Sequence, residues 1–421
     1  MSGPLSGLHV VELATAIQGP AAGLYFANMG ANVIKVEPPM GDASRYHRGV
    51  NYTSAVGALG SQFVAMNKGK RSISLDVHTD LGAAVMDRLL SEADVFLSNY
   101  RASALVRMGL DVHALTEKYA QLVVGHVNGF GPLGPDADKA MLDGAAQARG
   151  GLASMSGHPG MTPTPPGVTV ADHAGAMQLA LACVTALFSR AQSGRGQLVQ
   201  TSSLGAQLWL QMWELQHSFI TNTPLTREGP HHPNIKAPYG VYMTQDGAPI
   251  LFVVAMTDDA WSEFWIFADK PEAILLEEWD NTGKRIGMAG SDAGLPEIRE
   301  LMIQAMGSKT MAEWETFLAA QPDIIWERVR DHSEVRDDPQ NRANDYIVDM
   351  EVPVTGKTST VGTLMAFSRT PTTAPDSLPA LGEHTAEIMT SLGFAETEVE
   401  SVREHAESAR QAMFEAMLGQ N

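Results

Sequence analysis

Short apolar runs alternate with amphipathic stretches along the first third of the chain. Apolar runs of this length, bounded by glycine, proline or polar residues, are typical of buried β-strands. They predict strands at residues 9–13, 32–37, 94–98 and 121–127. The stretches between the first three runs have the periodicity of helices, at residues 20–29 and 79–92. Strands separated by helices require right-handed crossovers, so the pattern predicts an α/β fold with a mainly parallel sheet.

The pattern changes in the rest of the chain. We expect a long helix at residues 172–192 and an amphipathic helical stretch at 204–220. A hairpin turn at 245–247 and an aromatic-rich helix at 261–267 follow. Two short strands, at 351–354 and 361–367, precede a charged final helix at 396–418. The hairpin and the aromatic-rich helices fall within residues 239–321 and indicate a smaller second domain.

Composition narrows the classes of partner. The 421 residues carry 48 acidic and 29 basic side chains, for a net charge of -19. Such a surface repels phosphate backbones and anionic lipid headgroups, so we expect no nucleic-acid and no membrane partner. An anionic small molecule would need a local basic patch. The chain begins without a basic and apolar leader, and no window approaches the roughly 18–20 apolar residues of a transmembrane helix, so we expect a cytoplasmic protein.

Metal and disulfide sites are disfavoured by the residue types. Cys183 is the only cysteine, which excludes an intramolecular disulfide and any site with several thiolates. It lies in an apolar run, so we interpret it as a buried structural thiol. His231 and His232 are adjacent, border Pro233 and lack the i,i+4 spacing of helical ligands, so we expect loop structure rather than a metal site there.

Three segments are candidate ligand sites, and the first and the third follow predicted strands, where α/β proteins place their ligands. Residues 14–23 are mostly small and could bring backbone N–H groups to a ligand, although a plain strand-to-helix turn explains them as well. The dinucleotide pattern G-x-G-x-x-G is missing, which disfavours a nicotinamide-dependent dehydrogenase. Residues 66–76 contain three cations, either in a solvated loop or in a patch for a phosphorylated ligand. Tyr100 and Arg107 could stack on and pair with a nucleotide.

Asp172 stands between an apolar strand-like run and the predicted long helix. Aspartate is a favoured helix N-cap, and that reading stays open beside a chemical role. Gly175 occupies the position at which a capping box would have Glu or Gln, so the box is incomplete.

Taken in order, several segments resemble the family III coenzyme A transferases, a group with formyl-CoA and carnitine-CoA transferases and 2-methylacyl-CoA racemases. The resemblance runs nearly from end to end. It is carried by residues 5–13, 30–38, 67–76, 93–109, 128–131, 194–197, 232–234, 238–242 and 381–385.

The resemblance implies that Asp172 is the catalytic aspartate. It places the coenzyme A site at Ile17, Gln18, Leu75, His78, Asn99, Tyr100, Arg107 and Met108. It also implies an interlocked homodimer. Each subunit would have a discontinuous Rossmann-like large domain (residues 1–222 and 335–421) and a smaller α+β domain (residues 223–334). The substrates would be acyl-CoA and carboxylic acids, without a metal or a redox cofactor.

The implied reaction is acyl-CoA:carboxylate CoA transfer through an aspartyl anhydride and an aspartyl-CoA thioester on Asp172. The alternative is a 2-methylacyl-CoA racemase, but racemases of the family carry a His–Asp pair where this chain has Leu142 and Asp143. Leu142 cannot exchange a proton, so racemisation would lose one of its two bases. A non-catalytic acyl-CoA binding protein is the alternative of another class.

Two further expectations concern the local chemistry. A helix N-terminus favours an ionised Asp172 by about 0.3–1 kcal/mol, and backbone N–H groups at Gly150 and Gly151 are expected to stabilise an oxyanion. The glycine-run loop of formyl-CoA transferase has no match at the corresponding residues 253–259.

Overall fold

The computed structural model describes residues 3–48, 57–235, 238–289 and 295–418. The chain forms two compact units, each of which is described by itself. The first unit comprises Met1–Gly150, Val168–Leu210 and Arg336–Asn421, and the second comprises Gly151–Gly167 and Gln211–Val335.

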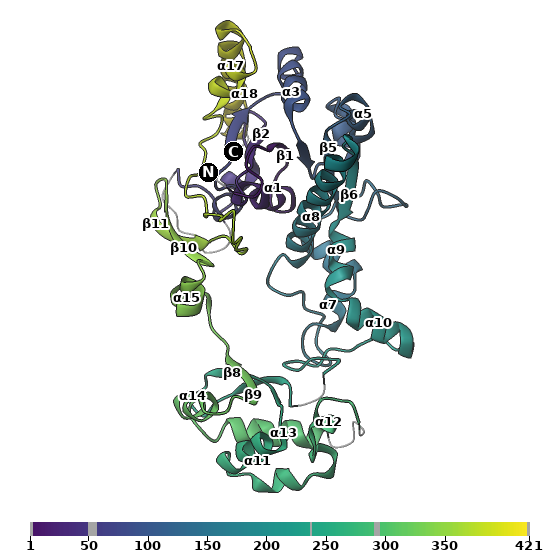
Figure 1. The fold of residues 1–421 in the computed structure, drawn as a ribbon, viewed down its shortest axis with the longest axis vertical. Coiled ribbons are helices and arrows are strands. Elements are labelled where there is room, and N and C mark those ends of the chain that lie inside the picture. The colour runs from purple at the N-terminus through teal and green to yellow at the C-terminus, as the bar shows by residue number, and fades with distance from the viewer. Residues whose placement is uncertain (1–2, 49–56, 236–237, 290–294, 419–421) are drawn as a thin grey trace. The chain divides into compact units, whose positions relative to one another are not determined.

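A six-stranded sheet forms the centre of the first unit (Figure 1). Its strands are β1 (His9–Leu13), β2 (Asn32–Glu37), β3 (Arg71–Ser74), β4 (Val95–Ser98), β5 (Val123–Asn128) and β6 (Leu198–Ser202). They lie in the order β3-β2-β1-β4-β5-β6, and all neighbouring strands are parallel. This is the strand order of doubly wound nucleotide-binding folds. The predicted α/β class and parallel sheet are therefore confirmed.

Alternating strand residues bury both faces of this sheet under helices. Val10, Val33 and Val95 point to the face covered by α1 (Gln18–Asn28) and α8 (Val170–Ser193). The next residue of each strand points to the opposite face, where the core includes residues of α3 (Asp80–Glu92), α4 (Ala102–Arg107), α5 (Val112–Lys118), α17 (Thr385–Ser391) and α18 (Glu396–Leu418). The result is a three-layer sandwich in which helices cover both faces of a parallel sheet, whose strand β6 is only partly buried.

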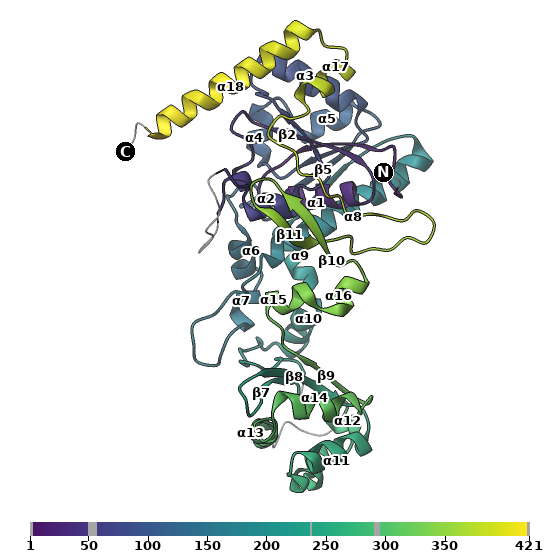
Figure 2. The same ribbon diagram turned by 90° about the vertical axis from the view of Figure 1, so that its left-hand side faces the viewer.

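The last segment of the chain completes the outer edge of the sheet. The His384 N–H donates to Ser72 O at 2.9 Å, and the Ser74 N–H donates to Thr385 Oγ1 at 3.2 Å. Ile388 and Met389 are buried in the same core as β2 and β3, and Figure 2 shows α17 and α18 next to α3. Helix α18 has the predicted bounds, residues 396–418, and belongs to the first unit.

The other elements of the first unit are short. They are η1 (Ala43–Arg45), α2 (Ser61–Met66), α6 (Asp143–Arg149), α9 (Ser203–Leu210), α16 (Pro339–Ala343) and the hairpin of β10 (Ile347–Val352) and β11 (Gly356–Val361). The expected strand at residues 361–367 is wrong, because β11 ends where that strand was to begin. α15 (His332–Asp337) crosses the boundary between the units.

An antiparallel sheet and an aromatic core form the second unit. Its strands β7 (Gly240–Met243), β8 (Pro249–Ala255) and β9 (Ile324–Arg328) lie in that order, and the predicted turn at residues 245–247 joins the first two. The helical elements are α7 (Leu152–Met155), α10 (Met212–Thr221), α11 (Asp258–Phe267), η2 (Pro271–Leu275), η3 (Glu277–Trp279), α12 (Thr282–Arg285), α13 (Leu295–Met306) and α14 (Met311–Ala319). Trp261, Trp265 and Trp314 are buried together in its core.

One expectation about membrane segments needs correction. By length and composition alone, α8 is long and apolar enough to cross a membrane, and 44% of the relevant window is buried inside the unit. Its inner face, with Ala176, Leu179 and Cys183, packs against the sheet, as expected of the core helix of a sandwich. Burial raises the pKa of the Cys183 thiol to about 12, in agreement with a structural role.

Candidate functional site

The carboxyl ends of β1 and β4 mark a topological switch point. β2 and β3 lie on one side of β1, whereas β4 to β6 lie on the other, so the turns after β1 and β4 lead in opposite directions. Ligands of doubly wound folds bind at such a point. Asn99 joins the two turns, because its Oδ1 accepts from Thr15 N at 2.9 Å and its Nδ2 donates to Thr15 O at 2.8 Å.

The structure brings several of the predicted coenzyme A residues to this edge. Ile17 is the N-cap of α1 and Gln18 its first residue, at the end of the turn that follows β1, and Asn99 and Tyr100 directly follow β4. Leu75 directly follows β3 and is buried in one core cluster, against which Tyr100 and Met108 pack. His78 and Arg107 are exposed, the latter as the last residue of α4.

Asp172 lies on the first turn of α8 as its third residue. Thr169 occupies the N-cap position, so the interpretation of Asp172 as the cap is wrong. The Asp172 backbone N–H donates to Asp143 Oδ1 at 3.0 Å, and its own Oδ1 accepts from Ser203 Oγ at 3.4 Å. The side chain is therefore free to present a carboxylate rather than to close the helix.

Burial decides the ionisation of Asp172. The pKa of its carboxyl is raised from the usual 3.8 to about 6, first by burial and then by the negative charge of Asp143, while the Ser203 hydroxyl and His173 act in the opposite direction. A shift of this size corresponds to roughly 3 kcal/mol, several times the 0.3–1 kcal/mol expected from the helix N-terminus. Burial therefore outweighs any effect of the helix N-terminus on the pKa of Asp172, and the carboxyl is still mostly ionised at pH 7, as expected.

A chain of polar side chains connects Asp172 to the turn after β1. Gln18 Nε2 donates to Ser203 Oγ at 2.7 Å, and Ser203 in turn reaches Asp172. Gly175 makes this approach possible, since a Cβ there would lie 2.3 Å from Gln18 Nε2. Gln147 donates to Asp143 from one helical turn away. Sequence reasoning missed Ser203 and Gln147; the position of Ser203 at the carboxyl end of β6 is the signal that could have found it.

Gly150 does not have the expected role. Its N–H donates to Ala146 O at 2.8 Å, so it closes α6 and is not available to an oxyanion. A Cβ at Gly150 would lie 2.5 Å from the Gln207 side chain, which explains why the helix ends on a glycine. Gly151 begins the second unit, with φ at 90°, and its role as a donor stays a prediction.

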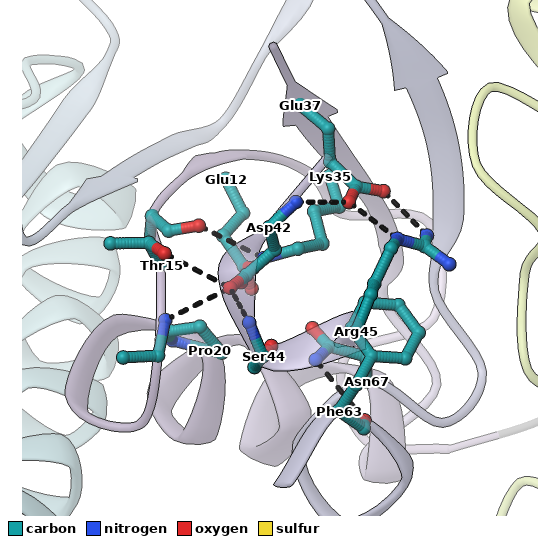
Figure 3. A network of polar contacts seen from close by, with 12 residues as sticks. Glu12, Thr15, Pro20, Lys35, Glu37, Asp42, Ser44, Arg45, Phe63 and Asn67 are labelled. Atoms are coloured by element: carbon teal, nitrogen blue, oxygen red, sulfur yellow. Dashed lines mark hydrogen bonds and ion pairs between the residues drawn. The ribbon is translucent and has the colours of Figure 1, made fainter. Parts of the chain in front are cut away.

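A buried network of charges lies next to Thr15 in the turn after β1 (Figure 3). Lys35 Nζ lies 3.0 Å from Glu12 Oε1 and 3.0 Å from Asp42 Oδ2, and it donates to Ala14 O at 2.9 Å. Asp42 Oδ1 accepts from Thr15 Oγ1 at 2.9 Å and lies 3.3 Å from the N–H of Ala16. Ala16 has a φ of 64°, a left-handed conformation that costs energy for a residue with a Cβ. The network therefore holds a strained turn in place.

Each of the three cations of residues 66–76 is paired within the protein, and only Lys70 belongs to the buried network. Lys70 is fully buried and lies 2.7 Å from Glu12 Oε2. Lys68 donates to Thr360 Oγ1 at 2.8 Å and to Val361 O on the β10–β11 hairpin. Arg71 pairs with Glu387 of α17 at 3.0 Å. Both interpretations of this segment, a solvated loop and a phosphate patch, are wrong for the two lysines.

The histidine pair has a structural setting in the second unit. His231 Nδ1 bonds Tyr239 O at 2.9 Å, while the His232 ring stacks on Trp213 with ring centres 5.6 Å apart. Both residues lie in a loop, as expected. Among the described parts of the chain, no three His, Cys, Asp or Glu residues form a group that could hold a metal ion.

Comparison with known proteins agrees with the resemblance found in the sequence. A family model described as CoA-transferase family III matches residues 5–385. The chain is similar to the succinate–glutarate CoA-transferase of Agrobacterium fabrum, at 32% identity with 92% of this chain and 96% of that protein covered. It is also similar to the (R)-2-hydroxy-4-methylpentanoate CoA-transferase of Clostridioides difficile, at 27% identity with 95% and 98% covered. A solved structure of a CaiB/BaiF family protein from Brucella suis matches with a TM-score of 0.80 at 28% identity, covering 93% of this chain and 100% of that one.

Proposed function

The chain belongs to CoA-transferase family III, and from this premise we propose that it moves coenzyme A between carboxylic acids through covalent intermediates on Asp172. Enzymes of this family take CoA thioesters as substrates, and the named relatives act on different acids. The observation that carries the proposal is the setting of Asp172. It is a largely buried carboxylate beside the switch point, with a raised pKa and one oxygen facing a hydroxyl.

Each step of the proposed reaction conserves one negative charge. The Asp172 carboxylate attacks the thioester carbonyl, the C–S bond breaks, and a mixed anhydride and the CoA thiolate result. The thiolate attacks the aspartyl carbonyl and releases the donor acid, which leaves an aspartyl-CoA thioester. The acceptor carboxylate then attacks this thioester, and the released thiolate attacks the new acyl group to regenerate Asp172. Exclusion of water matters because hydrolysis would destroy both intermediates, and the burial of Asp172 supports that requirement.

Leu142 supports transfer rather than racemisation. Leu142 has no ionisable group and is 81% exposed. It is the residue before α6, and Asp143 is the first residue of that helix. Racemisation would need a second base at that position. We therefore expect transfer without proton exchange at the α-carbon of the acyl group.

We propose that the turns after β1, β3 and β4 hold coenzyme A, through Ile17, Gln18, Leu75, His78, Asn99, Tyr100, Arg107 and Met108. The ligand carries phosphates, whereas the protein has a net charge of -19, so local cations are needed. Lys68 and Lys70 are occupied internally. Arg101, the residue before α4, and Arg107, the last residue of α4, are both exposed and could supply such cations.

A homodimer is part of the proposal. α8 exposes Met177, Leu181, Val184 and Phe188 at 56%, 68%, 37% and 68%, along the face away from the sheet. The spacing of four, three and four residues makes one apolar stripe, which a second copy of the chain would cover. Leu181→Glu should shift light-scattering mass toward the monomer, while the control Ile303→Glu, an exposed site in α13, should not. An unchanged mass would contradict this assembly.

The same premise leads us to propose a cytoplasmic enzyme without nucleic-acid or membrane partners. The net charge of -19 supports this, because it opposes binding to polyanionic surfaces. Only small-molecule acyl-CoA and carboxylic acids are then needed for activity.

The central experiment is mass spectrometry of the intact protein after incubation with a panel of acyl-CoA thioesters. We expect a covalent CoA adduct that maps to Asp172, and transfer to labelled acceptor acids. Asp172→Asn should abolish both. Asp80→Asn is the matched control, since Asp80 is an exposed aspartate in the first turn of α3. Tight CoA binding without an adduct would instead indicate a binding protein, and full activity of Asp172→Asn would refute the proposal.

A further inference from the structure

Ser203 occupies a junction that the proposed reaction does not yet explain. It is wholly buried where β6 passes into α9. Its Oγ lies 2.7 Å from Gln18 Nε2 on α1 and 3.4 Å from Asp172 Oδ1 on α8. Three elements that are distant in the sequence therefore meet at one hydroxyl.

The direction of these hydrogen bonds follows from the donors. An amide nitrogen only donates, so Ser203 Oγ accepts from Gln18 and keeps its own proton for a second partner. The Asp172 carboxylate accepts that proton at Oδ1. The separation of 3.4 Å is longer than the usual 2.7–2.8 Å of such bonds, and catalytic hydrogen bonds commonly tighten only when substrate is bound.

We propose that Ser203 is a positioning residue that fixes one oxygen of the Asp172 carboxylate and leaves the other oxygen, Oδ2, to attack the thioester. The inference rests on the proposed function of Asp172. Gln18 orients the hydroxyl from the turn that also lines the coenzyme A site, so the turn and the nucleophile are coupled through Ser203. The carboxylate is thereby held in one rotamer before the substrate arrives.

The charges around Asp172 make the effect of Ser203 measurable. Asp143 faces it from α6 and opposes its ionisation, while His173 on its own helix and Ser203 from α9 favour the anion. Loss of the Ser203 hydroxyl removes one of the groups that favour the Asp172 anion, while the repulsion from Asp143 stays. The acid limb of the rate profile should therefore move to higher pH, by about one pH unit for one hydrogen bond to a charged group.

The test uses three variants. Ser203→Ala removes the hydroxyl, and Ser203→Thr keeps one. Ser202→Ala is the control, because Ser202 Oγ accepts from Gly205 N at 3.0 Å and so serves the start of the same helix. We expect Ser203→Ala to lower kcat about tenfold at pH 7, with the acid limb displaced upward. Ser203→Thr should restore much of both, and Ser202→Ala should leave the pH profile unchanged.

A second readout does not depend on activity. The side-chain carboxyl of Asp172 can be titrated by carbon-13 nuclear magnetic resonance in protein labelled at aspartate, with the signal assigned by its loss in Asp172→Asn. We expect a midpoint near 6 that rises in Ser203→Ala. An unchanged midpoint and acid limb would overturn the inference, even if the melting temperature falls. If the midpoint moves as expected but no acyl-CoA of the panel reacts, the proposed function fails while the contact stands.

Discussion

Lys35 gives the sharpest stability test, because its ammonium group sits at the centre of the buried network. The side chain has no exposed surface, and Glu12, Asp42 and Ala14 O lie within 3.0 Å of its Nζ. Burial alone would lower the pKa of Lys35, but the charges of Glu12, Asp42 and Glu37 raise it above its ordinary value. Lys35→Met replaces the ammonium by an apolar group of similar length.

The magnitude follows from counting charges. Glu12, Glu37 and Asp42 balance Lys35, Lys70 and Arg45, so the variant leaves one uncompensated negative charge in the interior. Removal of one partner from a buried pair costs about 3–5 kcal/mol. Two effects favour the lower end of this range of cost. The pKa of Lys70, lowered by burial to about 8, should rise without Lys35 beside it, so Lys70 stays charged. Asp42 also keeps its hydrogen bonds from Thr15 and Ser44. We expect Lys35→Met to lower the free energy of unfolding by about 3 kcal/mol.

The assay must report on the first unit. All tryptophans except Trp209 lie in the second unit, so their fluorescence would miss the change. Hydrogen exchange of peptides that cover β1 and β2 is the suitable measurement, with β7 and β8 as the internal reference. A loss of about 3 kcal/mol makes exchange through opening of β1 and β2 roughly a hundredfold faster.

Two variants sharpen the interpretation. Lys35→Met combined with Asp42→Asn restores the balance of charge and should lose less stability than the sum of the single changes. Lys118→Met breaks an exposed pair with Asp87 and should cost less than about 1 kcal/mol. A loss below about 1 kcal/mol for Lys35→Met would refute the reasoning, as would equal loosening of β7 and β8.

The other predictions concern the site. The pKa of Asp172 is raised from 3.8 to about 6, so the folded state binds more protons than the unfolded state between these values and loses stability as pH rises through them. Asp172→Asn should therefore abolish transfer. Its free energy of unfolding, measured with urea, should rise by up to ~3 kcal/mol at pH 7 and hardly change at pH 4. Gly175→Ala displaces Gln18 and should lower kcat/KM on the order of tenfold with hydrogen exchange of α8 unchanged; normal kinetics would contradict it. Arg107→Ala should raise KM for acyl-CoA about tenfold at constant kcat, whereas Arg88→Ala, an exposed arginine on α3, should not; a change in kcat alone would refute a role in binding.

Elements with a clear apolar period could be predicted from the sequence alone. β2 has the expected bounds because its side chains are buried on both faces, and α18 has them because its charged period is unbroken. β11 was misplaced because its residues 357–360 are polar and give no strand signal. The stretch at residues 204–220 forms two helices, which are interrupted at Gln211. The sequence gives no sign of this break, because glutamine is a good helix former; in the structure its side chain is buried.

The site divides in the same way. Asp172 could be singled out as a candidate because aspartate at the start of a helix is conspicuous and the family resemblance points to it. Ser203 could not, because its partner Gln18 is 185 residues away. Lys70 looked like a surface cation because its partner Glu12, 58 residues earlier, lies in an apolar strand where burial of a charge pair is invisible to local pattern. Tertiary pairing decided both cases.

The division of the first unit among three chain segments bears on how the protein is made. The core cluster of β2 and β3 includes Ile388 and Met389 of α17, which are synthesised long after both strands. Synthesis of the stretch between β6 and α17 takes roughly 9–36 s at about 5–20 residues per second. Over that interval α17 cannot yet pack against Val36 and Ile73, whereas the second unit can complete its own core. Nascent chains are therefore most open to aggregation until α17 has been made, and truncation before α17 would leave the core of β2 and β3 incomplete.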